Sequence, residues 1–445
     1  MGDWAGFDSL LSHLRQAICQ FPDKRKGKNT SYEVEDFALA AFSVFFTQSP
    51  SFLSHQQYLE DTQGKNNART LFGIQKIPGV TQIRDVLDGV EPALLKPAFT
   101  STLAELQQTP EFGRFQYSGL KNSLLVALDG TGYFYSDKIC CDRCQVIQKT
   151  SGKKEVTGYQ HTCLIPAIVR PDEPVVLPLF PEFITPQDGD AKQDCEYKAS
   201  VRWLGGDHPE LSKYDVTILG DDLYAKQGIC QAILDNEWDF ILTCKDPSHK
   251  YLKEEVELRS QAGEATSHQR TYWNGKHKLT ETYRWVLGVP LRENQGLEVN
   301  WVEVVIADET GKESYRNCFV TSHFIDHENV VALIGAARAR WKIENEGNNT
   351  LKNHGYHLEH NFGHGKKCLS QTLLAMNLLA FLFHSLLEVL DQPYKEVRQL
   401  LGRRKKFFDH VEALTTYFVY DKFDLLIAFM LERLRATRSS KKPRS

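Results

Sequence analysis

Two short apolar runs, each followed by an aspartate, constrain the fold of this chain most strongly. The run LLVAL leads into Asp129, and the run VTIL, followed by a glycine, leads into Asp221. We interpret both runs as buried strands. A carboxylate at the end of a strand is held rigidly by the sheet, while its side chain reaches solvent at the sheet edge. The two aspartates are therefore candidate site residues.

A third acid, Glu344, lies in a polar segment of helical character, ARARWKIENEGNNTLK. Two strand ends and one helix would converge on a pair of divalent cations. Two such cations, about 3.5–4 Å apart, clamp the attacking and leaving oxygens of a phosphodiester displacement. Each acid alone has a simpler interpretation, because Asp129 would shape a turn and Asp221 or Asp222 would cap the following helix. The joint occurrence of the three favours the metal hypothesis.

Strands alternate with helices after an initial antiparallel group, which predicts an α/β fold with a mixed sheet. Apolar residues at three- and four-residue spacing predict helices at both ends of the chain. We predict five regions: a helical N-terminal domain at 1–115, the first part of the α/β core at 120–245, a β-rich insertion at 246–320, the remainder of the core with the Glu344 helix at 321–370, and a helical C-terminal region with a basic tail at 371–445.

The chain of 445 residues has a net charge of -4, so no overall basic field indicates nucleic acid. A DNA-binding face would have to be local. Basic residues gather at Lys24–Lys28, at Arg403–Lys406 and in the tail Arg433–Ser445. Each cluster suits either phosphate contacts or a solvated segment, and the sequence leaves both open.

The cellular compartment is predicted from three absences in the sequence. The N-terminus lacks the apolar core of a signal peptide. The apolar stretch from Leu373 is interrupted by Asn377, His384 and Glu388, so we interpret it as a buried helix and not as a membrane span. Ten cysteines in so long a chain argue against a disulfide framework. We expect a cytoplasmic protein.

The long interval between Asp221 and Glu344 leaves room for the β-rich insertion. The spacing of the three acids fits a ribonuclease-H-like core in which the first and fourth strands carry aspartate. Particular strings then carry a resemblance: SPSFL, LFGI and RDVLD near the N-terminus, ALDGTGYF, DDLYAKQ, RWKIEN and LKNHGYHLEHNFGHG. On these strings the chain resembles the DDE transposases of bacterial insertion sequences, in the IS-four type with a Tyr-Arg-Glu-Lys signature.

The resemblance covers most of the chain and implies a ribonuclease-H-like fold interrupted by a β domain. It implies strand cleavage and strand transfer with Mg²⁺, for which Mn²⁺ would substitute. Asp129, Asp221 and Glu344 would be the catalytic metal ligands. Asp221 is preferred to Asp222 because the family has an aromatic residue three positions after its aspartate, where Tyr224 stands here.

The signature around Glu344 is matched in part. Arg340 stands four positions before Glu344, as the signature requires, and would position DNA phosphate. The signature tyrosine is replaced by Ala337, and the signature lysine falls one position late, at Lys352. On an ideal helix Lys352 would lie about 80° round the axis from Glu344. Glu346 is a weaker candidate for the third carboxylate.

The implied partners are double-stranded DNA, at terminal inverted repeats and at the target, and a second copy of the chain in a synaptic complex. The resemblance also implies a bacterial protein associated with the nucleoid, and the N-terminal domain is a candidate for binding the DNA ends. An alternative function is a DNA-binding relative of transposases that no longer cleaves. Three tryptophans of the β-rich insertion, Trp273, Trp285 and Trp301, would stack on an unpaired base, although core packing is expected for at least two.

A second constellation combines Cys141 and Cys144 with His161 and Cys163. Four soft ligands of this kind would hold a structural Zn²⁺ and define a zinc-stabilised interaction protein. The single-residue spacing of the second pair argues against zinc, and we expect reduced thiols instead. The histidines of HLEHNFGHG, including His364, are expected in a loop beside the site or at the DNA.

Overall fold

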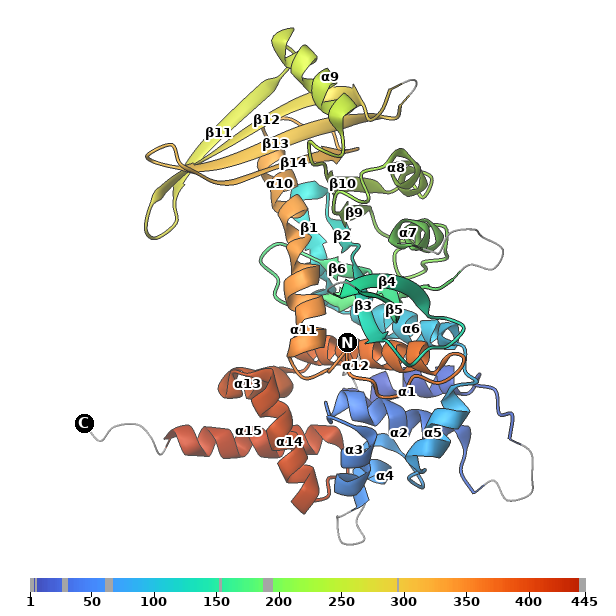
Figure 1. Ribbon diagram of the computed structural model, residues 1–445. Helices are drawn as coiled ribbons and strands as arrows, with labels where there is room; N and C mark the ends of the chain where they lie inside the picture. Colours follow the sequence, from blue (N-terminus) through green and yellow to red (C-terminus); the bar gives the residue numbers. More distant parts are fainter. Residues whose placement is uncertain are drawn as a thin grey trace.

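The computed structural model describes residues 4, 6–25, 31–60, 67–151, 154–186, 195–293 and 296–439. The fold is mixed α/β, with a large mixed sheet and helical N- and C-terminal parts (Figure 1). This confirms the predicted fold class at that level. The predicted basic segments at Lys24–Lys28 and Arg433–Ser445 fall partly outside the described residues.

The N-terminal part is a group of helices packed against helices from the far end of the chain (Figure 1). Its elements are α1 (Phe7–Ile18), α2 (Val34–Phe46), α3 (Phe52–Glu60), α4 (Asn67–Phe72), α5 (Val80–Leu87), η1 (Pro92–Leu95), α6 (Lys96–Gln107) and η2 (Pro110–Phe115). Helix α2 is buried on nearly every side, because its run of alanine and phenylalanine side chains faces both α5 and the long C-terminal helix α12 (Leu369–Leu390).

The main sheet has the strand order β11-β12-β13-β14-β10-β9-β2-β6-β7, and β1 pairs with β2. Its central strands β2, β9 and β10 are parallel, whereas β6 and β14 run antiparallel to their neighbours. The strands are β1 (Gln116–Tyr117), β2 (Ser123–Ala127), β6 (Ala167–Val169), β7 (Leu177–Pro178), β9 (Val216–Gly220) and β10 (Asp239–Thr243), with η3 (Ser118–Leu120) before β2. Helices α7 (Glu196–Leu204) and α8 (Gln227–Leu234) lie beside the sheet on the same side (Figure 1).

Four strands between α9 (Lys250–Gln261) and the helix that carries Glu344 extend the main sheet. They are β11 (Thr266–Trp273), β12 (Lys278–Pro290), β13 (Glu298–Asp308) and β14 (Glu313–Thr321), and they project far from the helical end of the molecule (Figure 1). Trp285 and Trp301 are buried in this sheet, whereas Trp273 is 65% exposed. The expectation that at least two of the three tryptophans pack in a core is confirmed.

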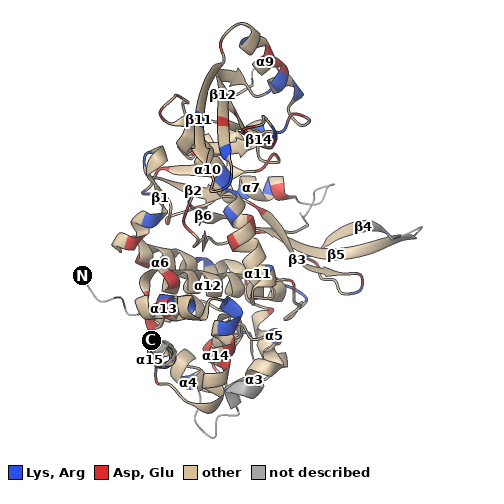
Figure 2. Ribbon diagram, turned by 90° about the vertical axis from the view of Figure 1, so that its left-hand side faces the viewer, with Lys and Arg blue, Asp and Glu red and all other residues tan. Residues whose placement is uncertain are grey.

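A second sheet has the order β3-β5-β4, and β8 (Glu182–Ile184) also pairs with β5. Its strands are β3 (Gly130–Ser136), β4 (Gln145–Ser151) and β5 (Lys154–Leu164). Strand β3 starts directly after Asp129, so this sheet grows out of the end of β2. The β4–β5 hairpin projects from the body of the molecule as an arm (Figure 2).

The C-terminal half is helical after β14. Helix α10 (Val330–Ala339) leads through the π-helix η4 (Ile343–Asn348) into α11 (Asn349–Asn353), and these elements run beside the main sheet (Figure 1). A loop then leads to α12, which is followed by α13 (Gln392–Leu401), α14 (Arg404–Tyr417) and α15 (Phe423–Ser439).

Helix α12 is long and apolar enough to cross a membrane, yet 89% of its most apolar window is buried inside the protein. That burial is typical of the core helix of a soluble protein. Asn377, one of its polar interruptions, donates a 2.9 Å hydrogen bond to the carbonyl of Tyr356. The interpretation of this stretch as a buried helix is confirmed.

Replacing a buried leucine of α12 should destabilise the whole fold. Leu379 is fully buried, so Leu379→Ala leaves a cavity and should lower the free energy of unfolding by about 2–5 kcal/mol. Leu425→Ala, at a side chain that is 52% exposed in α15, is the matched control and should change it by less than about 0.5 kcal/mol. Urea titration followed by tryptophan fluorescence measures both. Equal effects of the two substitutions would contradict the central position of α12.

Candidate functional site

The pairing of β2 with β9 brings Asp129 and Asp221 to one edge of the sheet. The two strands are parallel, and Ala127 stands opposite Leu219. Beyond that pair, the Leu128 amide donates a 2.9 Å hydrogen bond to the Leu219 carbonyl. Asp129 and Asp221 each stand two residues after this pair. Because adjacent strands lie about 4.8 Å apart, the two aspartates are neighbours at the sheet edge.

Glu344 lies in the helical segment η4, and its negative charge is one cause of the raised pKa of Asp129. Burial, followed by the negative charges of Glu344 and Glu196, raises the pKa of Asp129 from 3.8 to about 7; Arg340 opposes the rise, and Asp221 adds to it. Like charges act in this way only at short range. The charges of Glu344 and Asp221 therefore lie close enough to Asp129 to raise its pKa.

Asn348 holds Asp129 in place. Its Nδ2 donates a 2.6 Å hydrogen bond to Oδ2 of Asp129. Asn348 stands four positions after Glu344, so both side chains come from the same π-helical segment, η4. Sequence reasoning missed Asn348, because an asparagine in a polar helix gives no local signal of its tertiary partner.

Glu196 is a fourth carboxylate of the site, and sequence reasoning missed it as well. It starts α7, and its Oε1 accepts hydrogen bonds from the Gly130 amide at 3.1 Å and from the Tyr224 hydroxyl at 2.5 Å. A Cβ on Gly130 would lie 2.3 Å from Oε2 of Glu196, so any larger residue after Asp129 would have to displace this carboxylate. The glycine after Asp129 in the string DGTG indicates a close contact at this position, but the sequence does not show that the contact is with Glu196.

The two rival acids point elsewhere. Oδ1 of Asp222 accepts a 2.6 Å hydrogen bond from the Lys245 amide and lies 3.5 Å from His249. Glu346 lines a separate cavity of about 270 Å³ together with Arg398 and Arg404. Neither acid is among the main charges that raise the pKa of Asp129. The geometry therefore favours Asp221 and Glu344 over their neighbours.

Arg340 lies against Glu344, with 2.6 Å between its Nη1 and Oε1 of the carboxylate. Its side chain is only 11% exposed, and that of Glu344 is 38% exposed. The guanidinium is therefore the nearest positive charge to the acidic group, and it lowers the pKa of Asp129 against the effect of the surrounding carboxylates.

The π-helix changes where Lys352 points. A π turn closes over one more residue than an α turn, so η4 adds a residue to the helix between Glu344 and Lys352. If that residue is discounted, the count places Lys352 about 20° round the axis from Glu344, against about 80° on an ideal helix. Lys352 pairs with Glu359 at 2.9 Å, and its charge reaches Cys163 on β5.

A cavity of about 270 Å³ opens beside these acids. Polar groups of β3, β4, β5 and α7 surround it, and its lining comprises Gly130, Thr131, Gly132, Gln145, Gln160, Thr162, Ile184, Cys195 and Glu196. A ligand in this cavity would approach the carboxylates from the side of the second sheet. Comparison with models of known protein families finds no match, and comparison with curated protein sequences finds none either.

The charge of Asp129 should make the stability of the metal-free chain depend on pH. The pKa of Asp129 is about 7 in the folded chain against 3.8 for an ordinary aspartate, so its contribution to stability is fully present below pH 3.8 and is lost as the pH rises through about 7. Asp129→Asn removes this dependence. In chelator, the variant should gain on the order of 4 kcal/mol over the native chain between pH 4 and pH 8.

Urea titrations of both chains at the two pH values measure this difference. Asp235→Asn, on the exposed end of α8, is the control and should show no such gain. A constant difference between native and Asp129→Asn chains at the two pH values would contradict the convergence of charge on Asp129.

Proposed function

We propose that this chain is a DDE transposase that cleaves DNA at the ends of a mobile element and joins the freed strand to a target. The observation that carries the proposal is the meeting of Asp129, Asp221 and Glu344 at one sheet edge, expressed in the raised pKa of Asp129. Carboxylates from two neighbouring strand ends and a helix are the arrangement that the sequence resemblance implies.

The strand order supports a ribonuclease-H-like core. In the series β7-β6-β2-β9-β10, the strands β2, β9 and β10 are parallel. Strand β6 is antiparallel to both of its neighbours, β2 and β7, so β7 runs in the same direction as β2. The aspartates follow the first and the fourth of these strands in chain order. The strands β11–β14 stand between the second aspartate and the Glu344 helix, where the resemblance implies a β insertion.

The acidic group fits hard divalent cations. Mg²⁺ and Mn²⁺ prefer carboxylate oxygens. Arg340 forms an ion pair with Glu344, whereas Asn348 and the Leu223 amide, which donate to Asp129 and Asp221, are uncharged. Asp129, Asp221 and Glu344 would hold the ions, which supply positive charge to the phosphate and lower the pKa of the attacking water or 3′-hydroxyl. The excess negative charge at Asp129 is the feature that such ions would relieve.

The remaining residues orient the acids and the DNA. Asn348 fixes one oxygen of Asp129, while Glu196 ties Gly130 to Tyr224 and so braces the end of β2 against the end of β9. We assign both as positioning residues. Arg340 and Lys352, on the face of the helix that carries Glu344, would hold backbone phosphates.

The decisive experiment is cleavage of double-stranded DNA that carries the terminal repeats flanking the coding sequence, with Mg²⁺. Asp129→Asn, Asp221→Asn and Glu344→Gln should each lower the rate by at least about 100-fold, since even the loss of an outer-shell partner typically costs 10- to 100-fold. Binding of the same DNA should persist in a gel-shift assay.

Glu346→Gln is the matched control for Glu344→Gln, because it makes the same change two positions along the helix, in a side chain that lines another cavity. It should cleave like the native chain. Binding without cleavage by the native chain would instead identify a DNA-binding relative that no longer cuts. Cleavage that survives Glu344→Gln but not Glu346→Gln would overturn the assignment of the third ligand.

Lys352 should contribute one phosphate contact if the π-helix turns it to the face of Glu344. Lys352→Ala should weaken DNA binding and lower the slope of log affinity against log salt by about 1, and Lys352→Arg should restore the slope. Fluorescence anisotropy at several salt concentrations measures this. An unchanged slope in Lys352→Ala would place the side chain away from the DNA.

A further inference from the structure

Four metal-binding side chains meet outside the acidic site. Cys141, Cys144, His161 and His364 each offer one ligand atom, and these atoms all lie within 4.8 Å of one another. The first three come from the second sheet and its β3–β4 connection, and His364 comes from the loop before α12. Spacing in the sequence suggests Cys163 as the fourth ligand, whereas in the structure His364 completes the cluster.

The distances match the edges of a tetrahedron around one ion. With Zn–S near 2.3 Å and Zn–N near 2.05 Å, tetrahedral ligands stand about 3.8 Å apart for two sulfurs and about 3.6 Å for sulfur and nitrogen. The two thiol sulfurs are 3.8 Å apart. Nε2 of His161 lies 3.5 Å from Sγ of Cys141 and 3.3 Å from Sγ of Cys144, and Nε2 of His364 lies 3.6 Å from Sγ of Cys144.

The surroundings suit a closed site. Cys144, His161 and His364 are buried, and Cys141 is partly buried. The Cys141 amide points to Sγ of Cys144 at 3.4 Å, and the Cys144 amide donates to the Cys141 carbonyl, so the Cys-x-x-Cys turn wraps one end of the cluster. The ring of Phe134 packs against His364 with 4.3 Å between centroids.

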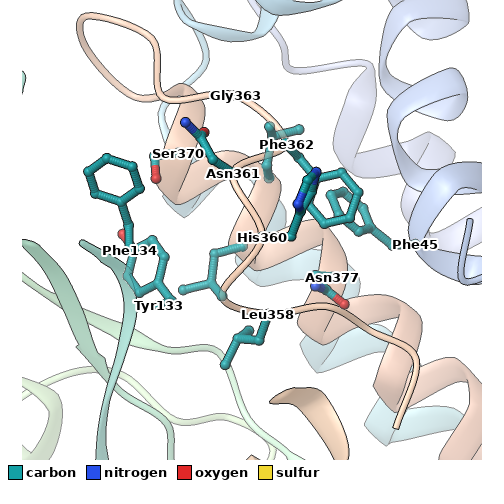
Figure 3. Close-up of a pocket in the computed structure, with 12 residues that line it drawn as sticks. Phe45, Tyr133, Phe134, Leu358, His360, Asn361, Phe362, Gly363, Ser370 and Asn377 are labelled. Atoms are coloured by element: carbon teal, nitrogen blue, oxygen red, sulfur yellow. The ribbon is translucent and has the colours of Figure 1, made fainter. Parts of the chain in front are cut away.

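The loop that carries His364 is held firmly in position. Arg84 donates two hydrogen bonds to the Phe362 carbonyl, at 2.7 and 3.0 Å. Asp88 accepts hydrogen bonds from the amides of Lys366, Lys367 and Leu369. Figure 3 shows the loop residues Leu358 to Gly363 passing between α12 and the strand residues Tyr133 and Phe134. A small cavity there is lined by Phe134, His360 and Phe362 among others.

We propose that Cys141, Cys144, His161 and His364 bind one structural Zn²⁺. Two thiolates and two imidazoles are the donor set that zinc prefers, and four protein ligands leave no open position for substrate, so the ion is structural and not catalytic. The proposal stands on this geometry alone and is independent of the proposed function. It replaces the expectation of reduced thiols.

The ion would link two segments that start at the acidic site, one following Asp129 and the other following Glu344. Strand β3 leads from Asp129 to the Cys-x-x-Cys turn, and the helix of Glu344 leads through α11 to the loop of His364. A metal bond between the ends of these segments would fix the second sheet relative to the Glu344 helix. Because ligands far apart in sequence are joined only in the folded chain, binding of zinc would add to the stability of the fold.

The test is the metal content of the full-length chain purified without chelator. We expect one zinc ion per chain by elemental analysis, and after exchange into Co²⁺ we expect the visible absorption bands of tetrahedral cobalt with thiolate ligands. Alkylation followed by mass spectrometry should find Cys141 and Cys144 protected until a strong chelator is added. A chain that holds no zinc and takes up neither Zn²⁺ nor Co²⁺ at one ion per chain would overturn the proposal.

Variants identify the ligands. Cys141→Ser and His364→Ala should lose the zinc and the cobalt bands, whereas Cys140→Ser, at the exposed neighbouring thiol, should keep both. The zinc-free variants should melt at lower temperature than Cys140→Ser. If the variants fail to fold, the cobalt spectrum of the native chain still decides whether two thiolates bind the ion. Full zinc content in Cys141→Ser would also overturn the assignment.

Discussion

The parallel pairing of β2 with β9 is the constraint on which the site depends. All five residues of each strand are buried, so the register cannot slip without turning apolar side chains out of the core. Once that register is fixed, Asp129 and Asp221 must leave the sheet side by side. The hydrophobic core therefore forces two negative charges together, and the surrounding structure has to accommodate them.

The surrounding groups of the described site do not fully balance the negative charge of these acids. Asn348, the Leu223 amide and Arg340 each donate to one of the three acids, yet the pKa of Asp129 still rises to about 7. Buried like charges that persist in a stable fold are typical of sites that bind a counter-ion or move a proton. Glu196 adds another carboxylate, and its Oε1 accepts hydrogen bonds from the Gly130 amide and the Tyr224 hydroxyl, which are both uncharged. The net excess explains why a divalent cation suits this edge of the sheet.

The sequence predicted those parts of the molecule that depend on local pattern. Apolar runs gave the strands before Asp129 and Asp221, and the burial of α12 followed from its composition. Glu196, Asn348 and His364 escaped prediction because each acts through a partner far along the chain. The cluster of Cys141, Cys144, His161 and His364 shows the same limit. Spacing alone paired His161 with Cys163, whereas the fold brings His364 to the cluster from the loop before α12.

A local irregularity in the helix of Glu344 changes the direction of the side chains that follow it. An ideal helix would turn Lys352 away from Glu344, and the late position of this lysine would then argue for an inactive relative. The extra residue of the π-helix η4 returns Lys352 towards the face of Glu344. A π-helix is less stable than an α-helix of the same length, so it persists where tertiary contacts hold it. Here the hydrogen bond from Asn348 to Asp129 ties the segment to the end of β2. The late position of the lysine and the extra residue of the helix therefore offset each other in the angle between Lys352 and Glu344.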